Sequence, residues 1–506
     1  MRFPLSRPLS TLLVVFLAVS GLFHFVNVQA RQREIEVTGI PVAAMSSFDR
    51  VMVGLMMKWG IPGGALAVVK DGRLVLAHGY GLADTDAEQL VQPDSLFRIC
   101  SISKPITAVA ILKLLEEGRL NLDDKAFAIL DNLKPRSGKP ADPRIYNVSI
   151  RHLLQHSGGW DREKTFDPMF ISREAASAVG APAPASCETV IRYMLERRLD
   201  FEPGTRYAYS NFGYCVLGRI IEKLTNQTYE EFVKSQILAP MGITDMRIGR
   251  TLLKDRVENE VRYYDYDGAP LVQSVFTSTK KLVLAPYGGF YLEALDAHGG
   301  WIASAIDLVR FAASIDGHRQ PAFLRPETVQ IMTARPAPPL WVGESYWYAM
   351  GWLVRPQRGA EANWWHAGSL PGSQTFLVRT YHGLAWAALF NTRLQKPDDG
   401  NLMNELDESL WRAESEVASW PGHDLFGMAT SSTTQTTVQT TVAGASQTTT
   451  TVPLTSAQRT QSETESTATA AQAVTWAFSI DMTVFAVIAF AIVALTAAYY
   501  LRRRGK

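Results

Sequence analysis

The chain has 506 residues, and its 50 basic and 49 acidic side chains leave a formal charge of +1, which argues against nucleic acid or an acidic polymer as a partner. Hydrophobic residues make up 47% of the chain, enough for a large buried core rather than a disordered protein. No cluster of His, Asp or Glu has metal-ligand spacing, so we expect neither a metal nor an organic cofactor.

Three cysteines occur along the chain, at Cys100, Cys187 and Cys215. Their spacing matches neither a metal site nor a disulfide framework. One pair could bridge and leave one free thiol, but our preferred interpretation is that all three are small buried residues without a bridge.

The N-terminus has the features of a secretory signal peptide. Arg2 and Arg7 precede an apolar stretch over residues 12–26, and Val28-Gln29-Ala30 offers small residues for cleavage. We therefore predict a signal peptide at residues 1–30, with an uncleaved anchor as the alternative.

The folded part is expected over residues 40–425 and begins with a hairpin. The strand sequences GGALAVVK and RLVLAHGYG flank a turn at Asp71-Gly72. This pattern predicts a β-hairpin from Gly63 to Gly81.

The segment FRICSISK places Ser101 three residues before Lys104, at the entry to an apolar helix that Gly118 should stop. Residues at this spacing share a helix face. The helix dipole also disfavours a positive charge here, which favours the neutral amine. The pair could be a nucleophile and a base, or only a helix-capping serine beside a solvated lysine.

A helix-rich subdomain is expected at about residues 120–285. It includes SIRHLLQHSGG and a predicted helix over VLGRIIEKLTNQTYEEFVKSQIL. Between them, Tyr209 and Asn211 of YSN follow a Pro203-Gly204 turn on a loop at an element boundary. Alone, YSN also fits a core-edge tyrosine and a turn-forming asparagine. Residues 160–186, rich in Pro and Ala, are expected to line the pocket entrance and to govern substrate choice.

The last part of the folded region reads as helix, strands and helix. Ser304 and Asp307 form a predicted capping box before DLVRFAASI. YAMGWLV, SQTFLVRT and LAWAALFN are predicted strands, and LMNELDESLWRAESE is a predicted closing helix. Just before the second strand stand His366, Gly368 and Ser369 of HAGS, where glycine allows close backbone approach. Strands at both ends with helices between them predict an α+β fold, an antiparallel sheet flanked by helices plus a mostly helical subdomain.

The C-terminal region suggests a tether. Residues 428–473 are rich in Thr, Ser, Gln and Ala, typical of a disordered stalk. Residues 480–501 include an apolar run long enough to span a bilayer as a transmembrane helix, and residues 502–506 form a basic tail. The positive-inside rule places that tail in the cytoplasm and the folded part outside, with the lipid bilayer as a partner.

The three motifs FRICSISK, YSN and HAGS, in this order, together resemble the serine β-lactamase and penicillin-binding protein superfamily, and within it the class C β-lactamase-like group. Further agreement comes from IPGGALAVVKDGRLVLAHGYG, GRLNLDD, IRHLLQHSGG, FEPGTRYAYSNFGYCVLGRIIE, GGWIASAIDLVRF and YAMGW, so the resemblance covers nearly all of residues 45–415. It implies a β-lactamase-like fold and a serine hydrolase acting on a small peptide, amide or ester.

The resemblance also implies roles for these residues. Ser101 would be the nucleophile, and Lys104 and Tyr209 would share the role of base, with the order of proton transfer left open. Asn211 would contact Lys104 and a substrate amide. The backbone N–H groups of Ser101 and Ser369, the latter following Gly368, would form the oxyanion hole.

His366 departs from the class C pattern, which has a lysine there. A histidine is mostly neutral at pH 7, so it attracts a substrate carboxylate less, and β-lactamase activity is the less favoured outcome. His156 is expected to have a structural role. The alternatives to a surface-anchored hydrolase are a penicillin-recognising sensor that does not turn over and an inactive binding scaffold on the same fold.

Overall fold

The computed structural model describes residues 34–276, 281–357 and 361–427. The predicted signal peptide (1–30), stalk (428–473), transmembrane helix (480–501) and basic tail (502–506) lie outside the described residues. Within the three described ranges, no helix is both long enough and apolar enough to cross a membrane.

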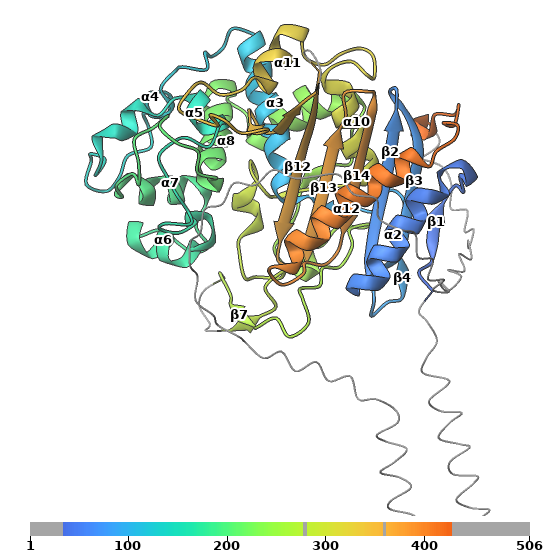
Figure 1. The fold of residues 1–506 in the computed structure, drawn as a ribbon. Coiled ribbons are helices and arrows are strands. Elements are labelled where there is room, and N and C mark those ends of the chain that lie inside the picture. The colour runs from blue at the N-terminus through green and yellow to red at the C-terminus, as the bar shows by residue number, and fades with distance from the viewer. Residues whose placement is uncertain (1–33, 277–280, 358–360, 428–506) are drawn as a thin grey trace, which may run out of the picture. The chain divides into compact units, whose positions relative to one another are not determined.

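A single antiparallel sheet forms the centre of the fold (Figure 1), in the strand order β1-β3-β2-β14-β13-β12-β11-β10, with β4 also paired to β3. The predicted antiparallel sheet is therefore confirmed. Its strands are β1 (Val37–Gly39), β2 (Gly63–Lys70), β3 (Arg73–Asp84), β4 (Gln89–Leu90), β10 (Trp347–Tyr348), β11 (Leu353–Pro356), β12 (Ala362–Leu370), β13 (Ser373–Arg379) and β14 (Leu384–Phe390).

The predicted hairpin is also confirmed, since β2 and β3 pair on either side of Asp71-Gly72. Both turn residues have positive φ, 49° and 76°, as a two-residue turn between twisted strands requires. Strand β2 then pairs with β14 near the other end of the folded region, with Lys70 opposite Leu384.

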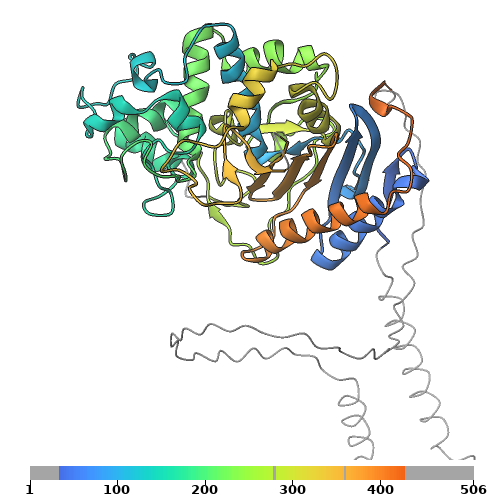
Figure 2. The same cartoon turned by 45° about the horizontal axis from the view of Figure 1, so that its top comes forward.

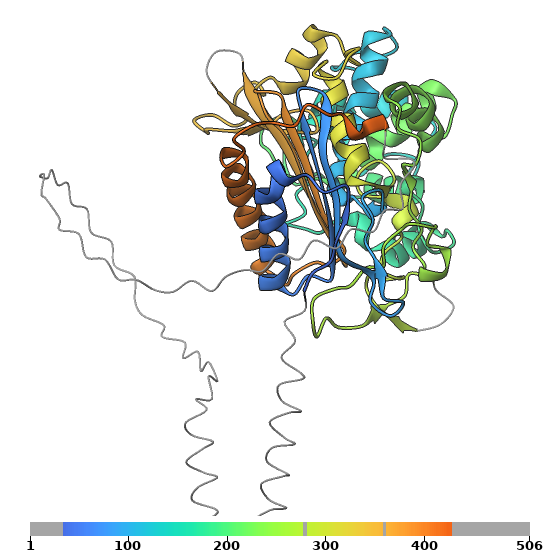
Figure 3. The ribbon, with the colours of Figure 1, turned by 90° about the vertical axis from the view of Figure 1, so that its right-hand side faces the viewer.

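Two helices cover one face of the sheet, α2 (Ser46–Trp59) and α12 (Asp398–Ser415), and Figures 2 and 3 show them side by side. The predicted closing helix is α12, and its Leu402, Leu406 and Leu410 recur every four residues and are fully buried. This stripe packs with the outer side chains of the strands, so burial of the apolar face fixes α12 on the sheet.

The other face of the sheet carries α3 (Ser103–Glu116) and α10 (Ala305–Ile315), with α11 (Pro326–Thr333) beside α3. The predicted capping box opens α10: Asp307 N–H donates to Ser304 Oγ at 3.1 Å, and Ser304 N–H donates to Asp307 Oδ2 at 3.1 Å. Helix α3 is buried on nearly every side, so it forms the core between the sheet and the helices beyond it.

Those further helices are α4 (Ala126–Ile129), α5 (Ile150–Leu154), α6 (Ser172–Val179), α7 (Cys187–Leu195), α8 (Asn211–Thr225) and α9 (Tyr229–Phe232). Helices α4 to α8 lie together beyond α3 in Figure 1. Two small antiparallel sheets complete the fold, one of β5 (Phe97–Arg98), β9 (Trp301–Ala303) and β6 (Arg247–Ile248), the other of β7 (Val272–Gln273) and β8 (Leu282–Val283).

The single helix predicted over VLGRIIEKLTNQTYEEFVKSQIL is wrong, because the structure breaks it. Helix α8 ends at Thr225, and Asn226 takes the left-handed conformation with φ 57°. Thr228 then caps α9 in a capping box with Glu231. Asn and Thr favour these end conformations over the helix interior, so two local caps outweigh the continuous apolar pattern.

The preferred interpretation of the cysteines is also wrong. Cys187 on α7 and Cys215 on α8 form a disulfide, with 6.1 Å between their Cα atoms. Cys100 alone is a free, buried thiol. The bridge could not be read from spacing, because it depends on the side-by-side packing of α7 and α8.

Candidate active site

Ser101 lies on the tight turn that joins β5 to α3. A turn of 3-10 helix covers Cys100–Ile102, and α3 begins at Ser103, so Ser101 to Lys104 form the predicted entry turn. Cys100 has φ 52°, a strained conformation for a residue with a side chain. The turn leaves Ser101 partly exposed while Lys104 is fully buried, and Lys104 Nζ lies 3.2 Å from Ser101 Oγ.

Lys104 Nζ lies among three hydrogen-bonding oxygen atoms, one of which is Ser101 Oγ at 3.2 Å. Its Nζ donates to Asn211 Oδ1 at 2.8 Å and to the His298 carbonyl at 3.0 Å. A neutral amine has two N–H donors and one lone pair, so the lone pair is left facing the Ser101 hydroxyl. Burial, and secondly the nearby Arg162, lower the pKa of Lys104 well below its usual value. Lys104 can therefore accept a proton from Ser101.

Tyr209 is brought to the same serine from the segment before α8. Ser210 caps α8 by accepting the Gly213 N–H at 3.1 Å, and Asn211 is the first residue of the helix. The Tyr209 ring lies 4.7 Å from Lys104 Nζ. Burial raises the pKa of the Tyr209 phenol, although the Ser101 hydroxyl opposes that rise, so Tyr209 is a neutral phenol at neutral pH.

His156 contacts the segment that carries Tyr209, which agrees with the structural role predicted for it. Its Nδ1 accepts the Ser210 N–H at 3.1 Å, and its ring lies 4.4 Å from the Tyr209 ring. Burial, and secondly the proximity of Lys104, lower the pKa of His156 well below its usual value. A neutral His156 therefore holds the Tyr209 segment through a hydrogen bond and ring packing.

His366 lies on the inner side of β12, buried and neutral. Its Nδ1–H donates to its neighbour's carbonyl, Ala367 O, at 2.7 Å, and its Nε2 lies 3.2 Å from the Tyr348 hydroxyl. Burial lowers the pKa of His366 to about 3, with Lys104 as the second cause. The expected neutral histidine is thus present. Its hydrogen-bond partner is Tyr348, the first residue of the YAMGW segment, to which no role was assigned from the sequence.

Gly368 lets β12 approach the turn that carries Ser101. A Cβ at this position would lie 2.5 Å from the Ile99 carbonyl oxygen and 2.3 Å from Thr375 Oγ1. Only glycine fits that approach, which explains the third residue of the HAGS motif in physical terms.

The same strand leaves an open edge beside Ser101. Strand β11 pairs with β12 only between Ala362 and Trp365. A two-residue turn follows Leu370, so Leu370 and Ser373 form a pair joined by backbone hydrogen bonds. Bonded and non-bonded residues alternate along an antiparallel strand, so every second N–H group of β12 points away from β13. Ser369 is one of these residues and is exposed, so its N–H is available to an oxyanion.

Two charged residues that sequence reasoning did not single out complete the site. Asp167 accepts a 2.6 Å hydrogen bond from Asn211 Nδ2, and Arg162 lies 3.9 Å from the same carboxylate. The Arg162 guanidinium also lies over the Tyr209 ring, 4.7 Å from its centre. Both belong to the predicted entrance segment 160–186, which has no recognisable motif. Within the described part of the chain, no group of three or more His, Cys, Asp or Glu side chains could hold a metal.

A protein-family model described as beta-lactamase matches residues 48–408. Penicillin-binding protein 4* of Bacillus subtilis (strain 168) is 28% identical over 322 residues, covering 62% of this chain and 65% of that protein. A putative fimbrial assembly protein FimD, serogroup D, of Dichelobacter nodosus is 27% identical over 333 residues, covering 64% of this chain and 73% of that one.

Solved structures share the fold. The octameric penicillin-binding protein homologue from Pyrococcus abyssi aligns with TM-score 0.55 and 24% identity, over 76% of this chain and 80% of that chain. The D-amino acid amidase from Ochrobactrum anthropi SV3 aligns with TM-score 0.55 and 20% identity, over 74% of this chain and 100% of that chain. At these identities the likeness extends to the fold alone.

Proposed function

The chain belongs to the beta-lactamase family of serine hydrolases, and we propose that it forms an acyl-enzyme on Ser101 with a peptide, amide or ester substrate. The observation that carries this proposal is the placement of a buried Lys104 amine 3.2 Å from a partly exposed Ser101 hydroxyl. A hydroxyl becomes a useful nucleophile only with a base in reach, and here that base has a lowered pKa.

Acylation would begin with transfer of the Ser101 proton to the Lys104 lone pair as Ser101 Oγ bonds to the substrate carbonyl carbon. The N–H groups of Ser101 and Ser369 would stabilise the oxyanion. Tyr209 would then donate its phenol proton to the leaving group. Lys104, now charged and 4.7 Å from the Tyr209 ring, lowers the pKa of that phenol when its proton must leave.

Deacylation would reverse these roles with water in place of the leaving group. Water attacks the acyl carbon, its proton goes to the Tyr209 phenolate, and Lys104 returns a proton to Ser101 Oγ as the ester bond breaks. Both residues end in their starting states, so the cycle balances without a metal or an organic cofactor. The order left open by the sequence is thereby proposed: Lys104 acts first in acylation.

The charges of the site favour particular substrates. His366 is neutral and buried, so this position supplies no fixed positive charge for a substrate carboxylate. We therefore propose DD-peptidase, D-amino-acid peptidase or esterase activity ahead of β-lactamase activity. The D-amino acid amidase has a similar fold, which is compatible with this choice.

We also propose that the catalytic part lies outside the cell and that the C-terminal segment 480–501 anchors it in the membrane. The sequence features of residues 1–30 and 480–506 support this, and so does the Cys187–Cys215 disulfide, because disulfides persist in oxidising compartments. Protease added to intact cells should degrade the folded part; protection of that part until the cells are lysed would contradict the proposed location.

The test of the catalytic proposal uses the full chain, a fluorophosphonate probe, a chromogenic ester and a D-amino-acid amide. Wild type should be labelled and should turn over at least one of the two substrates. Ser101→Ala should abolish both, while Ser137→Ala, at an exposed loop serine, should change neither. Labelling that persists in Ser101→Ala would contradict the assignment of the nucleophile, and labelling without turnover would indicate a sensor instead.

A further inference from the structure

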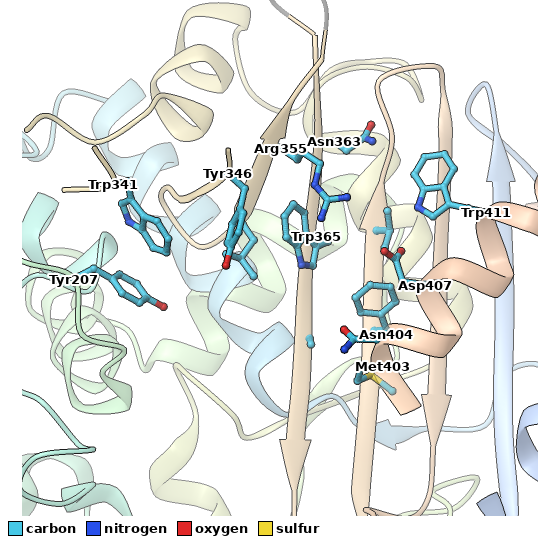
Figure 4. Close-up of a pocket in the computed structure, with 14 residues that line it drawn as sticks. Tyr207, Trp341, Tyr346, Arg355, Asn363, Trp365, Met403, Asn404, Asp407 and Trp411 are labelled. Carbon is cyan, nitrogen blue, oxygen red and sulfur yellow. The ribbon is translucent and has the colours of Figure 1, made fainter. Parts of the chain in front are cut away.

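A groove of about 490 Å³ lies on the outer face of β12 and β13, beneath α12. We call it the aromatic groove, and its main lining residues are Tyr207, Trp341, Tyr346, Trp365, Asp407 and Trp411 (Figure 4). Figure 4 shows Trp365 on β12 between Tyr346 on one side and Asp407 of α12 on the other. Because side chains alternate along a strand, Trp365 and His366 face opposite sides of the sheet.

A series of aromatic rings joins this groove to the catalytic centre around the edge of the sheet. The Tyr207 ring lies 5.9 Å from the Tyr348 ring, and Tyr348 contacts His366. On the groove side, the Tyr207 ring lies 4.6 Å from the Trp341 ring. The Trp341 ring lies 5.7 Å from the Tyr346 ring, which in turn lies 6.0 Å from the Trp365 ring. Tyr207 is also only two residues before Tyr209, so the groove and the catalytic centre share one chain segment.

Polar groups surround the aromatic surface of the groove. Arg355 stacks 5.1 Å above the centre of the Trp365 ring, and Asp407 and the exposed Asn404 project from α12. Burial raises the pKa of Asp407, and the charge of Arg355 opposes this. The lining therefore holds one cation, one anion and uncharged groups that can both donate and accept hydrogen bonds.

We propose that the aromatic groove binds a carbohydrate. A saturated sugar ring has weakly polar C–H faces that stack on aromatic rings, and its hydroxyl groups require both donors and acceptors around the edge. A lipid chain would offer no hydrogen bond to the half-buried Asp407 carboxyl that it covers, at a desolvation cost. A ligand with a single charge would be repelled by whichever of Arg355 and Asp407 carries the same sign of charge.

Carbohydrate binding in this groove would also specify the substrate of the proposed hydrolase. Tyr207 lines the groove and its ring lies 5.9 Å from the ring of Tyr348, which contacts His366, so a sugar bound at the Tyr207 end of the groove would lie beside the catalytic centre at the edge of the sheet. The inferred substrate is an ester or amide that carries a sugar. That extension rests on the proposed function, whereas carbohydrate binding in the groove does not depend on hydrolysis.

The test measures binding by calorimetry to the full-length Ser101→Ala protein, with cellobiose, N,N′-diacetylchitobiose and maltose as probes and benzyl alcohol as an apolar comparator. We expect saturable binding of at least one saccharide at millimolar concentration. Trp365→Ala and Asn404→Ala should each weaken that binding about ten-fold. Asn401→Ala, three residues earlier on α12 and outside the groove, should bind like the parent.

Three outcomes would overturn the proposal: no saccharide binds, only benzyl alcohol binds, or a saccharide binds equally well to the Trp365 and Asn404 variants. Asn404 is exposed, so its variant remains informative even if Trp365→Ala does not fold. Because the parent protein already lacks the Ser101 hydroxyl, failure of the hydrolase proposal would leave this result unchanged, and the two failures are distinguishable.

Discussion

Asp167 accepts a 2.6 Å hydrogen bond from Asn211 Nδ2, and this contact fixes the orientation of the amide. With its nitrogen held by Asp167, Asn211 presents Oδ1 to Lys104 at 2.8 Å. A partly buried carboxylate therefore acts on the base through an asparagine that the motif already identified. Asp167 and Arg162 are positioning residues, and each should shift the pH dependence of the proposed reaction.

Asp167→Asn should move the acidic limb of kcat/KM to lower pH. The carboxylate raises the pKa of Lys104, so removing its charge lowers that pKa further, and the amine stays unprotonated in more acidic solution. A pH profile with a chromogenic ester measures the shift. A limb that is unchanged or moves to higher pH would contradict the role given to Asp167.

Arg162→Gln should produce the opposite shift. The guanidinium lowers the pKa values of both Lys104 and Tyr209, so its removal raises both and moves the acidic limb to higher pH. The shift should be modest, because the Arg162 side chain is 37% exposed and solvent screens its charge. In the same assay, the Asp167→Asn/Arg162→Gln double variant should return towards the wild-type profile.

Tyr209→Phe should affect amides far more than activated esters. An amide nitrogen must receive a proton to leave, whereas a nitrophenolate leaves without one. Loss of the phenol should therefore lower kcat/KM, which reports acylation and not the deacylation step that both substrates share, by about 10²–10⁴-fold for a D-amino-acid amide and far less for a nitrophenyl ester. Steady-state kinetics on both substrates provides the comparison. Equal losses on the two would indicate that Tyr209 does not protonate the leaving group.

Gly368→Ala should lower catalytic activity far more than it lowers the stability of the fold. The new Cβ would meet the Ile99 carbonyl and Thr375 Oγ1, so β12 must move away from the Ser101 turn. We expect kcat/KM to fall about 100-fold, with a cost of about 1–3 kcal/mol in the free energy of unfolding. Gly54→Ala, in α2 with no atom within 4 Å of its new Cβ, is the matched control. It should retain activity and gain slightly in stability.

The disulfide should contribute about 3–4 kcal/mol to stability, since Cys187 and Cys215 are 28 residues apart. Cys187→Ala should lower Tm, and a reducing agent should lower the Tm of wild type but not of the variant. Cys100→Ala should leave the sensitivity to reductant unchanged, because Cys100 is unbridged. A wild-type Tm that is insensitive to reductant would show that the bridge does not form.

What the sequence predicted well is local in the chain. The turn at Asp71-Gly72, the cap of Ser304 on α10, and the face shared by Ser101 and Lys104 each depend on a few neighbouring residues. Family motifs added Tyr209, Asn211 and His366, and the structure gathers all three around Lys104 and Ser101. The antiparallel α+β fold followed from the order of strand and helix patterns.

The rest was decided by tertiary packing. Asp167 reaches Asn211 across 44 residues, and Tyr348 reaches His366 because β10, β11 and β12 pair in one register. Neither contact has a periodic signal in the sequence, and neither does the Cys187–Cys215 bridge. Helix and turn geometry fixes how close residues three or four apart can lie, whereas partners far apart in the chain meet only when whole elements have packed.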